Sequence, residues 1–385
     1  MITTKAKHGV HGVKSDLKMG LGKSDRQLRT LLAQLLLYSV YSVYSAFPAL
    51  AQSQQFPAVT PGKKIEFPRD AGAHPEYRIE WWYVTGHLES ARGPMGFQVT
   101  FFRLRNPEAE ANPSRFSPSQ ILFAHAALAE PAKGRLAHDQ RSARALPPLV
   151  EAATSGTDVR IDDWSLRREA SGYRTVVAAE GLTLDLAMTP TQAPLLQGDA
   201  GFSRKGPLAS QASYYYSEPH LQVSGRIVAS GKATAVRGIA WLDHEWSSEV
   251  LAAEAVGWDW LGVNLEDGAA LTAFRIRARD GRTVWANATL RPAVGPPRTF
   301  GPDSVAFRPL RTWTSPRSSA VYPVAMEVEV GAERWRIEPL MDDQELDARA
   351  STGTVYWEGA VRATGAPRGG RGYLELTGYT ERVPF

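Results

Sequence analysis

Residues 238–247 read Gly-Ile-Ala-Trp-Leu-Asp-His-Glu-Trp-Ser, and we expect them to form one β-strand. Successive side chains of a strand point to opposite faces, which places Asp243 and Glu245 on one face and His244 and Trp246 on the other. In a closed β-barrel, one face of each strand points into the lumen and the other points outward. Either the imidazole or the two carboxylates therefore face a cavity, but not both.

Carboxyl groups and an imidazole among large aromatic side chains indicate a functional site. With the nearby Gly257-Trp-Asp-Trp260, residues 241–260 contain four Trp, two Asp, three Glu and one His. A buried carboxyl group without a partner stays protonated at neutral pH, so it can donate a proton to an alkene, and tryptophan faces stabilise a developing carbocation. The alternative is that the acids and the histidine form a buried polar clamp with arginine or backbone partners. The candidate catalytic residues are Asp243, His244, Glu245 and Asp259.

The substrate-binding residues are expected to be mainly aromatic. Residues Glu80-Trp-Trp-Tyr83 repeat the combination of a carboxylate with aromatic rings, and Tyr214-Tyr-Tyr216 can supply hydroxyl groups. We expect the face of His244 to meet the face of Trp258 in a pocket between two domains, because tryptophan pairs need a large common volume. Asp243 and its neighbour on the same face would then lie outside the pocket and bind arginines. The candidate substrate-binding residues are Glu80, Trp82, Tyr216, Trp246, Trp258 and Trp260.

Short apolar or alternating segments follow one another along most of the chain. Ser-Gly and Asp-Gly pairs, such as those at 171–172 and 267–268, separate them. Short strands with glycine-containing turns at this spacing are typical of all-β sandwiches or barrels. Residues 190–215 lack such a pattern and are expected to form a long loop. We predict an all-β chain with two tandem barrel domains, residues 52–213 and 214–385.

The first 51 residues have the pattern of a signal peptide with a preceding leader. Basic residues between Lys23 and Arg29 precede an uncharged apolar run over 31–50, which ends in the small-residue sequence Ala49-Leu-Ala51. This order predicts cleavage after that sequence and a secreted, periplasmic protein. A permanent membrane anchor is the alternative, because the run approaches the length of a membrane span. Met19 is an alternative start of translation.

Composition and motifs argue against several classes of function. Residues 1–51 carry a net charge of +5 and the whole chain +4, so the mature chain is close to −1, which argues against nucleic acid as a partner. The absence of cysteine excludes disulfides and thiolate metal sites. His244 has no second histidine two or four positions further on, and no dinucleotide or phosphate-binding motif occurs. We therefore expect no metal and no cofactor.

Several blocks of sequence together resemble the AttH/carotenoid 1,2-hydratase superfamily, whose bacterial members are often labelled predicted secreted hydrolases. The resemblance implies two lipocalin-like β-barrel domains in tandem. In the characterised enzymes it also implies cofactor-free, acid-catalysed hydration of isoprenoid double bonds. The blocks are Pro75-Glu-Tyr-Arg-Ile-Glu-Trp-Trp-Tyr-Val-Thr-Gly-His-Leu88, Tyr214-Tyr-Tyr-Ser217, Trp241-Leu-Asp-His-Glu-Trp-Ser-Ser248 with Gly257-Trp-Asp-Trp260, and Gly372-Tyr-Leu-Glu-Leu-Thr-Gly-Tyr379.

This sequence differs from the pattern of the superfamily at one catalytic position. The His-x-Trp element of the hydratases matches His244 and Trp246, but the stretch Leu271-Thr-Ala-Phe-Arg275 has no counterpart of their catalytic aspartate. Asp243, Glu245 or Asp259 would have to supply the acid.

Two functions follow for a secreted protein with an aromatic pocket for a hydrophobic, isoprenoid or lipid-like ligand. One is a cofactor-free acid-catalysed hydratase, isomerase or cyclase. The other is a non-catalytic periplasmic lipid carrier or chaperone that serves an ABC-type transporter of the inner membrane. A cavity-facing carboxyl group with a strongly raised pKa favours the enzyme. A cavity whose polar groups are all satisfied favours the carrier.

Overall fold

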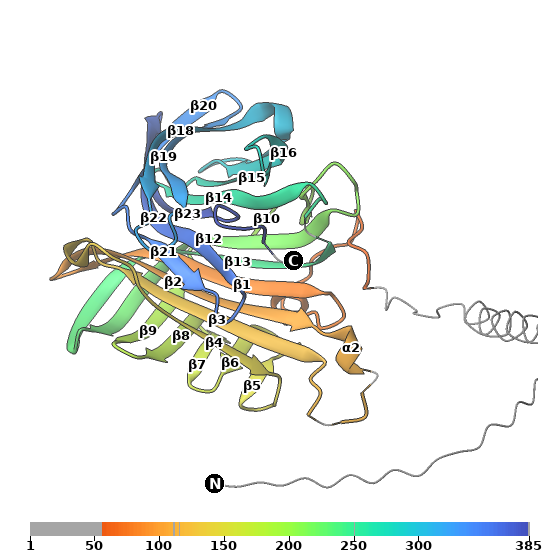
Figure 1. The fold of residues 1–385 in the computed structure, drawn as a ribbon. Helices are drawn as coiled ribbons and strands as arrows, with labels where there is room; N and C mark the ends of the chain where they lie inside the picture. Colours follow the sequence, from red (N-terminus) through yellow and green to blue (C-terminus); the bar gives the residue numbers. More distant parts are fainter. Residues whose placement is uncertain (1–55, 111, 115, 250, 384–385) are drawn as a thin grey trace, which may run out of the picture. The chain divides into compact units, whose positions relative to one another are not determined.

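Two antiparallel β-sheets follow one another along the chain and form two lipocalin-like barrels (Figure 1). The computed structural model describes residues 56–383 except 111, 115 and 250. The expected signal peptide and leader lie outside the described residues. The all-β prediction is confirmed, because helix is limited to short pieces: α2 (Pro107–Glu110) and the 3-10 turns η1 (Arg69–Ala71), η2 (Pro131–Lys133) and η3 (Pro302–Ser304). None of the helices in this part of the chain has the length and apolarity that crossing a membrane requires.

The first sheet contains long strands that form its centre and short strands that form its edge. Its strands are β1 (Ile79–Ser90), β2 (Gly93–Arg105), β3 (Gln120–Ala129), β4 (Ala137–Arg144), β5 (Val150–Ala152), β6 (Asp158–Ile161), β7 (Trp164–Glu169), β8 (Gly172–Ala179), β9 (Leu182–Thr189), β10 (Leu195–Leu196), β11 (Phe202–Arg204), β12 (Ala212–Ala229) and β13 (Lys232–Glu249). They pair in the order β4-β3-β2-β1-β13-β12-β9-β8-β7-β6-β5, with β10 and β11 on β12. The barrel closes where β3 and β4 contact β6.

The second sheet is built in the same way from the remaining strands. These are β14 (Ala255–Leu265), β15 (Ala270–Ala278), β16 (Thr283–Arg291), β17 (Arg298–Phe300), β18 (Val305–Thr314), β19 (Val321–Val330), β20 (Glu333–Pro339), β21 (Glu345–Ala348), β22 (Thr354–Ala366) and β23 (Gly370–Leu376). They pair in the order β17-β16-β15-β14-β23-β22-β20-β19-β18, with β21 on β22. Contacts of β18 with β15 and β16 close this barrel.

The sheets divide the chain between Glu249 and Ala255, downstream of the expected boundary at residues 213 and 214. The difference arises because β12 and β13 form a long hairpin whose two strands pair with β9 and β1 of the first sheet. The segment 190–215 does contain little regular structure, as expected, and its short strands β10 and β11 pair with β12 of the first sheet.

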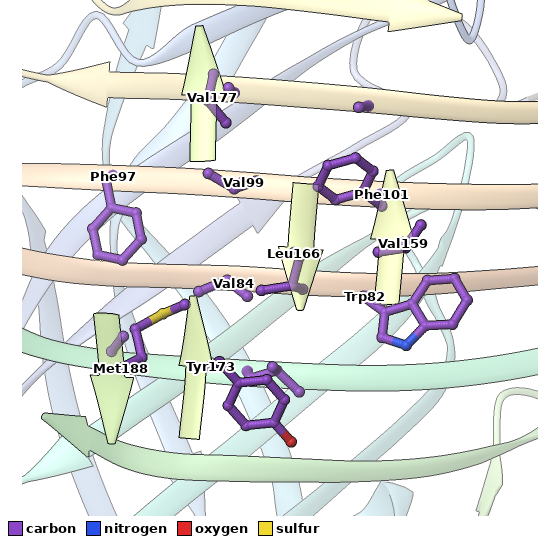
Figure 2. Close-up of a cluster of buried hydrophobic side chains, with 14 of the residues drawn as sticks. Trp82, Val84, Phe97, Val99, Phe101, Val159, Leu166, Tyr173, Val177 and Met188 are labelled. Atoms are coloured by element: carbon purple, nitrogen blue, oxygen red, sulfur yellow. The ribbon is translucent and has the colours of Figure 1, made fainter. Parts of the chain in front are cut away.

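Of the four apolar clusters among the described residues, the three largest stabilise this arrangement most. One fills the first barrel, where side chains of β1 and β2, such as Trp82 and Phe101, meet those of the short strands that cross them (Figure 2). A second fills the other barrel around Trp335 and Trp357. The third lies between the sheets and includes Trp260. β1, β2, β12 and β13 therefore have a buried side outside their own barrel, facing β14, β22 and β23.

Candidate functional site

β13 is buried on both faces, and each face has its own environment. All residues from Ala240 to Ser247 are buried. In the pairing of β1 with β13, Trp82 lies opposite His244 and Tyr83 lies opposite Asp243. The face of Trp82 and His244 points into the first barrel, whereas the face of Tyr83 and Asp243 points toward the second sheet. The strand is thus turned over relative to our expectation, which placed the histidine in the inter-domain pocket.

Glu80 is the centre of a polar cluster inside the first barrel. Nδ1 of His74 and Nε2 of His244 both lie 2.8 Å from its Oε1, and Arg103 donates from Nε to its Oε2 at 2.9 Å. Burial alone would raise the pKa of Glu80, but the bonds from the two histidines and the charge of Arg103 hold it well below its usual range. An ionised, fully hydrogen-bonded glutamate of this kind fixes the interior of the barrel.

The same three side chains are the residues of the described chain that could hold a metal ion. One donor atom each of His74, Glu80 and His244 lies within 4.8 Å of the others. The spare nitrogen of His74 faces Asp70 at 3.2 Å, an outer contact that metal-bound histidines also make. Arg103, however, already neutralises Glu80. The hydrogen bonds therefore account for this cluster without an added cation.

The other aromatic candidates on this face pack around the two histidines. Trp82 stacks on His244 with ring centres 4.7 Å apart, and Trp246 stacks on His74 at 3.8 Å. The hydroxyl of Tyr216 lies 3.2 Å from Nδ1 of His244. Four residues that we expected at the substrate, Glu80, Trp82, Tyr216 and Trp246, thus lie inside the first barrel, together with the candidate catalytic His244.

A cavity lies where the two sheets face each other. It has about 990 Å³ of space, including the part that is open to solvent. Side chains from β1, β2, β3 and β13 form one wall, and side chains from β14, β15, β22 and β23 form the other. Of the candidate residues, the structure brings Asp243, Glu245, Trp258 and Trp260 together here. The other aromatic rings of the wall are Trp81, Tyr83, Phe102, Phe274 and Tyr356.

Asp243 is a buried carboxyl group at this cavity. Ser217 donates to its Oδ1 at 2.5 Å, Trp241 donates to the same oxygen at 2.7 Å, and Tyr215 donates to its Oδ2 at 2.8 Å. Burial raises the pKa of Asp243 to about 7, with a contribution from the charge of Glu245, although the three hydrogen bonds act in the opposite direction. A large fraction of Asp243 is therefore protonated near neutral pH, and its partners are hydroxyl and indole groups instead of the expected arginines.

Two glutamates of the second sheet add to this acidic group. Glu358 on β22 lies directly opposite Glu375 on β23. Burial and the neighbouring charges of Asp243 and Glu245 raise the pKa of Glu375 to about 7. Burial and the charge of Glu375 raise the pKa of Glu358 well above its usual range. Carboxylates on directly opposite positions repel each other, so that the pair retains a proton at neutral pH.

Lys205 is the one buried lysine in the part of the chain that the structure describes, and it partly balances these acids. Nζ of Lys205 lies 2.9 Å from Oε1 of Glu245. It also lies 4.2 Å from the ring centre of Phe274 and 4.7 Å from that of Tyr215. Lys205 and Glu245 therefore form a buried ion pair in the wall. The alternative drawn from the sequence was a buried polar clamp with arginine or backbone partners, and here the cation is a lysine.

Asp259 lies on the opposite side of β14 from Trp258 and Trp260 and does not line the cavity. Arg275 and Arg277 donate to it at 2.6 and 2.8 Å, and the hydroxyl of Tyr379 lies at 3.0 Å. This candidate acid is thus held in a buried ion cluster of the second barrel, where it can position strands but cannot reach a ligand in the cavity.

Sequence reasoning missed Lys205, Glu358 and Glu375. Glu358 follows Tyr356-Trp357 in an apolar strand, and a glutamate in such a strand was a usable signal. Glu375 lies in the last block of the resemblance, between two leucines. Lys205 gave no signal, because it lies in the segment without periodicity.

Comparison with known proteins agrees with the fold. A sequence model of the AttH-like family matches residues 58–379. The crystal structure of a protein from Nitrosomonas europaea that is assigned as an AttH is 56% identical, covers 84% of this chain and 99% of its own, and has a TM-score of 0.79. Kievitone hydratase from Nectria haematococca shares the fold at 15% identity, with 85% and 96% coverage and a TM-score of 0.63. No curated protein matches. The chain belongs to the AttH-like family.

Proposed function

We propose that this protein binds an apolar, unsaturated small molecule, isoprenoid or lipid-like, in the cavity between its barrels and transfers a proton to it. The reaction would be a cofactor-free hydration, isomerisation or cyclisation. The observation that carries the proposal is a carboxyl group, Asp243, with a pKa of about 7 in a wall made largely of aromatic rings. A general acid works best when its pKa lies near the working pH.

The chemistry requires only groups of the cavity and water. The proton of the Asp243 carboxyl group would move to one carbon of a double bond, where the π electrons form the new C–H bond. The positive charge on the other carbon would be stabilised by the faces of Trp258 and Trp260. Water then forms the C–O bond and returns a proton to the carboxylate. In an isomerisation, a neighbouring C–H bond supplies the electrons in place of water, and its proton returns to the carboxylate. In a cyclisation, a C=C bond of the same molecule forms the ring, and the new carbocation then loses a proton to the carboxylate or adds water.

Two further observations support an enzyme over a carrier. Oε2 of Glu358 is buried without a hydrogen-bond partner in the described part of the chain, so the cavity is not one whose polar groups are all satisfied. The fold also accommodates a hydratase, as the name of the fungal relative states. A periplasmic location, and a carrier that serves an ABC-type transporter, rest on the leader and the resemblance alone.

Deuterium uptake tests the proposal directly. The protein without residues 1–51 would be titrated with a panel of isoprenoid alkenes and fatty acids, with quenching of Trp258 and Trp260 as the readout. We expect roughly micromolar affinity, about −8 kcal/mol. Ligands that bind would then be incubated in D₂O, recovered and analysed by mass spectrometry. Hydration, isomerisation and cyclisation all place a solvent deuterium on carbon.

The control separates the acid from the fold. Asp243→Asn should abolish deuterium uptake while leaving binding intact, whereas Asp185→Asn, the same change at a half-exposed position of β9, should alter neither. Saturable binding without deuterium uptake across the panel would refute the catalytic proposal and favour the carrier. Absence of binding would refute both.

A further inference from the structure

Glu358 is a cavity residue whose hydrogen bonds are incomplete. Its side chain is 1% exposed, and it lines the cavity from β22. Tyr83, from the opposite wall, donates to Oε1. Oε2 is buried and has no partner among the described residues. A buried polar atom left in this state is costly, so a site of this kind is typically completed by a ligand or by water.

The chemistry of Glu358 indicates what can complete it. Burial and the facing Glu375 favour the neutral acid, since their effect is to raise the pKa of Glu358 well above its usual range. Oε1 already accepts the hydroxyl of Tyr83, which leaves Oε2 to carry the proton. A neutral carboxyl group in that state presents an O–H donor. The missing partner is therefore a hydrogen-bond acceptor.

We propose that Glu358 binds an oxygen atom of the ligand, so that the substrate class is an apolar, unsaturated molecule that carries a carbonyl or hydroxyl group rather than a pure hydrocarbon. This inference rests on the proposed function, because it names the ligand of the same cavity. It adds a specificity-determining role to a residue that neither the sequence motifs nor the acid chemistry of Asp243 requires.

The strand register places this oxygen close to the proposed proton donor. Tyr83, which donates to Glu358, lies directly opposite Asp243 on the paired strand. Trp260 and Glu358 lie on either side of Glu375 in the other sheet. Neighbouring strands are about 4.8 Å apart. A ligand held at Glu358 therefore presents a double bond to Asp243 and Trp260 when the oxygen is only a few bonds away from it.

A matched pair of ligands tests the inference. Geranylgeraniol and the C20 hydrocarbon that lacks only its hydroxyl group would be titrated by tryptophan quenching. We expect the alcohol to bind about three- to tenfold more tightly, as a hydrogen bond to a neutral donor provides. Glu358→Met has nearly the same shape and no donor, so it should remove this preference. Glu358→Gln retains an N–H donor and should preserve most of it.

The outcomes distinguish the inference from the function on which it rests. Equal affinities of the two ligands for the wild-type protein would overturn the role of Glu358 and leave the apolar cavity intact. A preference that persists in a folded Glu358→Met variant would overturn it as well, since the oxygen would then be bound elsewhere. If neither ligand binds, the proposed function fails together with the inference. Should Glu358→Met not fold, the wild-type comparison and Glu358→Gln still decide.

Discussion

The polar cluster inside the first barrel permits a sharp prediction about Glu80→Gln. The glutamate is fully buried and accepts four hydrogen bonds: Nδ1 and the backbone N–H of His74 and Nε2 of His244, each at 2.8 Å, and Nε of Arg103 at 2.9 Å. Glutamine can turn its amide group toward the imidazoles and retain hydrogen bonds. It cannot supply the negative charge that balances Arg103, which is itself 1% exposed.

We expect Glu80→Gln to lower the free energy of unfolding by about 3–5 kcal/mol, the cost of leaving a buried charge without its partner. Equilibrium unfolding in urea, followed by near-UV circular dichroism, measures the change. Glu89→Gln breaks an ion pair of similar length with Arg371 on the surface and should leave the midpoint almost unchanged. Adding Arg103→Met to Glu80→Gln should recover part of the loss, because no uncompensated charge then remains buried.

Ligand affinity is the second readout of the same variant. Glu80 faces the interior of the first barrel and does not line the cavity between the sheets. The folded fraction of Glu80→Gln should therefore bind apolar ligands as the wild type does. A variant that keeps its stability but loses ligand would refute this reasoning, because it would place the functional site around His244 inside the barrel.

Three further predictions follow from the structure. The rate of deuterium uptake should fall as the pH rises through about 7, because Asp243 then loses its proton. The free energy of unfolding should also decline between about pH 4 and 7, since the folded protein holds protons on Asp243 and Glu375 that the unfolded chain releases near pH 4. Asp243→Asn should flatten this stability profile, measured by urea unfolding at each pH. Asp259→Asn should destabilise the fold by about 3 kcal/mol, because Arg275 and Arg277 lose their counter-charge. Calorimetry on the folded variant should show unchanged ligand binding, and a stable variant without activity would contradict the structural role of Asp259. Expressed from Met19 in a Gram-negative host, the protein should reach the periplasm with Gln52 as its first residue, and N-terminal sequencing that finds the leader intact in the membrane fraction would identify an anchor instead.

The sequence alone determined the secondary structure around the site. The alternation in residues 238–247 predicts a strand, and it correctly separates Asp243 and Glu245 from His244 and Trp246, because side-chain direction in a strand depends only on the local backbone. The Ser-Gly and Asp-Gly pairs between short apolar segments predict an all-β chain, because turn formation also depends on the local backbone. The four blocks of resemblance predict the family and two lipocalin-like barrels.

The tertiary structure alone decided which face is the functional one. A strand normally shows its inner face by the contrast between apolar and polar residues, but β13 is covered by its own barrel on one side and by the second sheet on the other. That contrast is therefore missing. The division of the chain depended in the same way on the long β12–β13 hairpin, whose hydrogen bonds to β1 and β9 no local pattern reveals.

The partners of the buried charges were also beyond the sequence. His244 and Glu80 are 164 residues apart, and Tyr83 and Glu358 are 275 apart, so no spacing rule for metal or catalytic motifs connects them. A charge is assigned to a structural cluster or to a cavity by the groups that surround it in space. Arg103 neutralises Glu80 and Arg275 neutralises Asp259, whereas Asp243 and Glu358 face a cavity without an arginine among its lining residues, and burial there raises the pKa of both carboxyl groups.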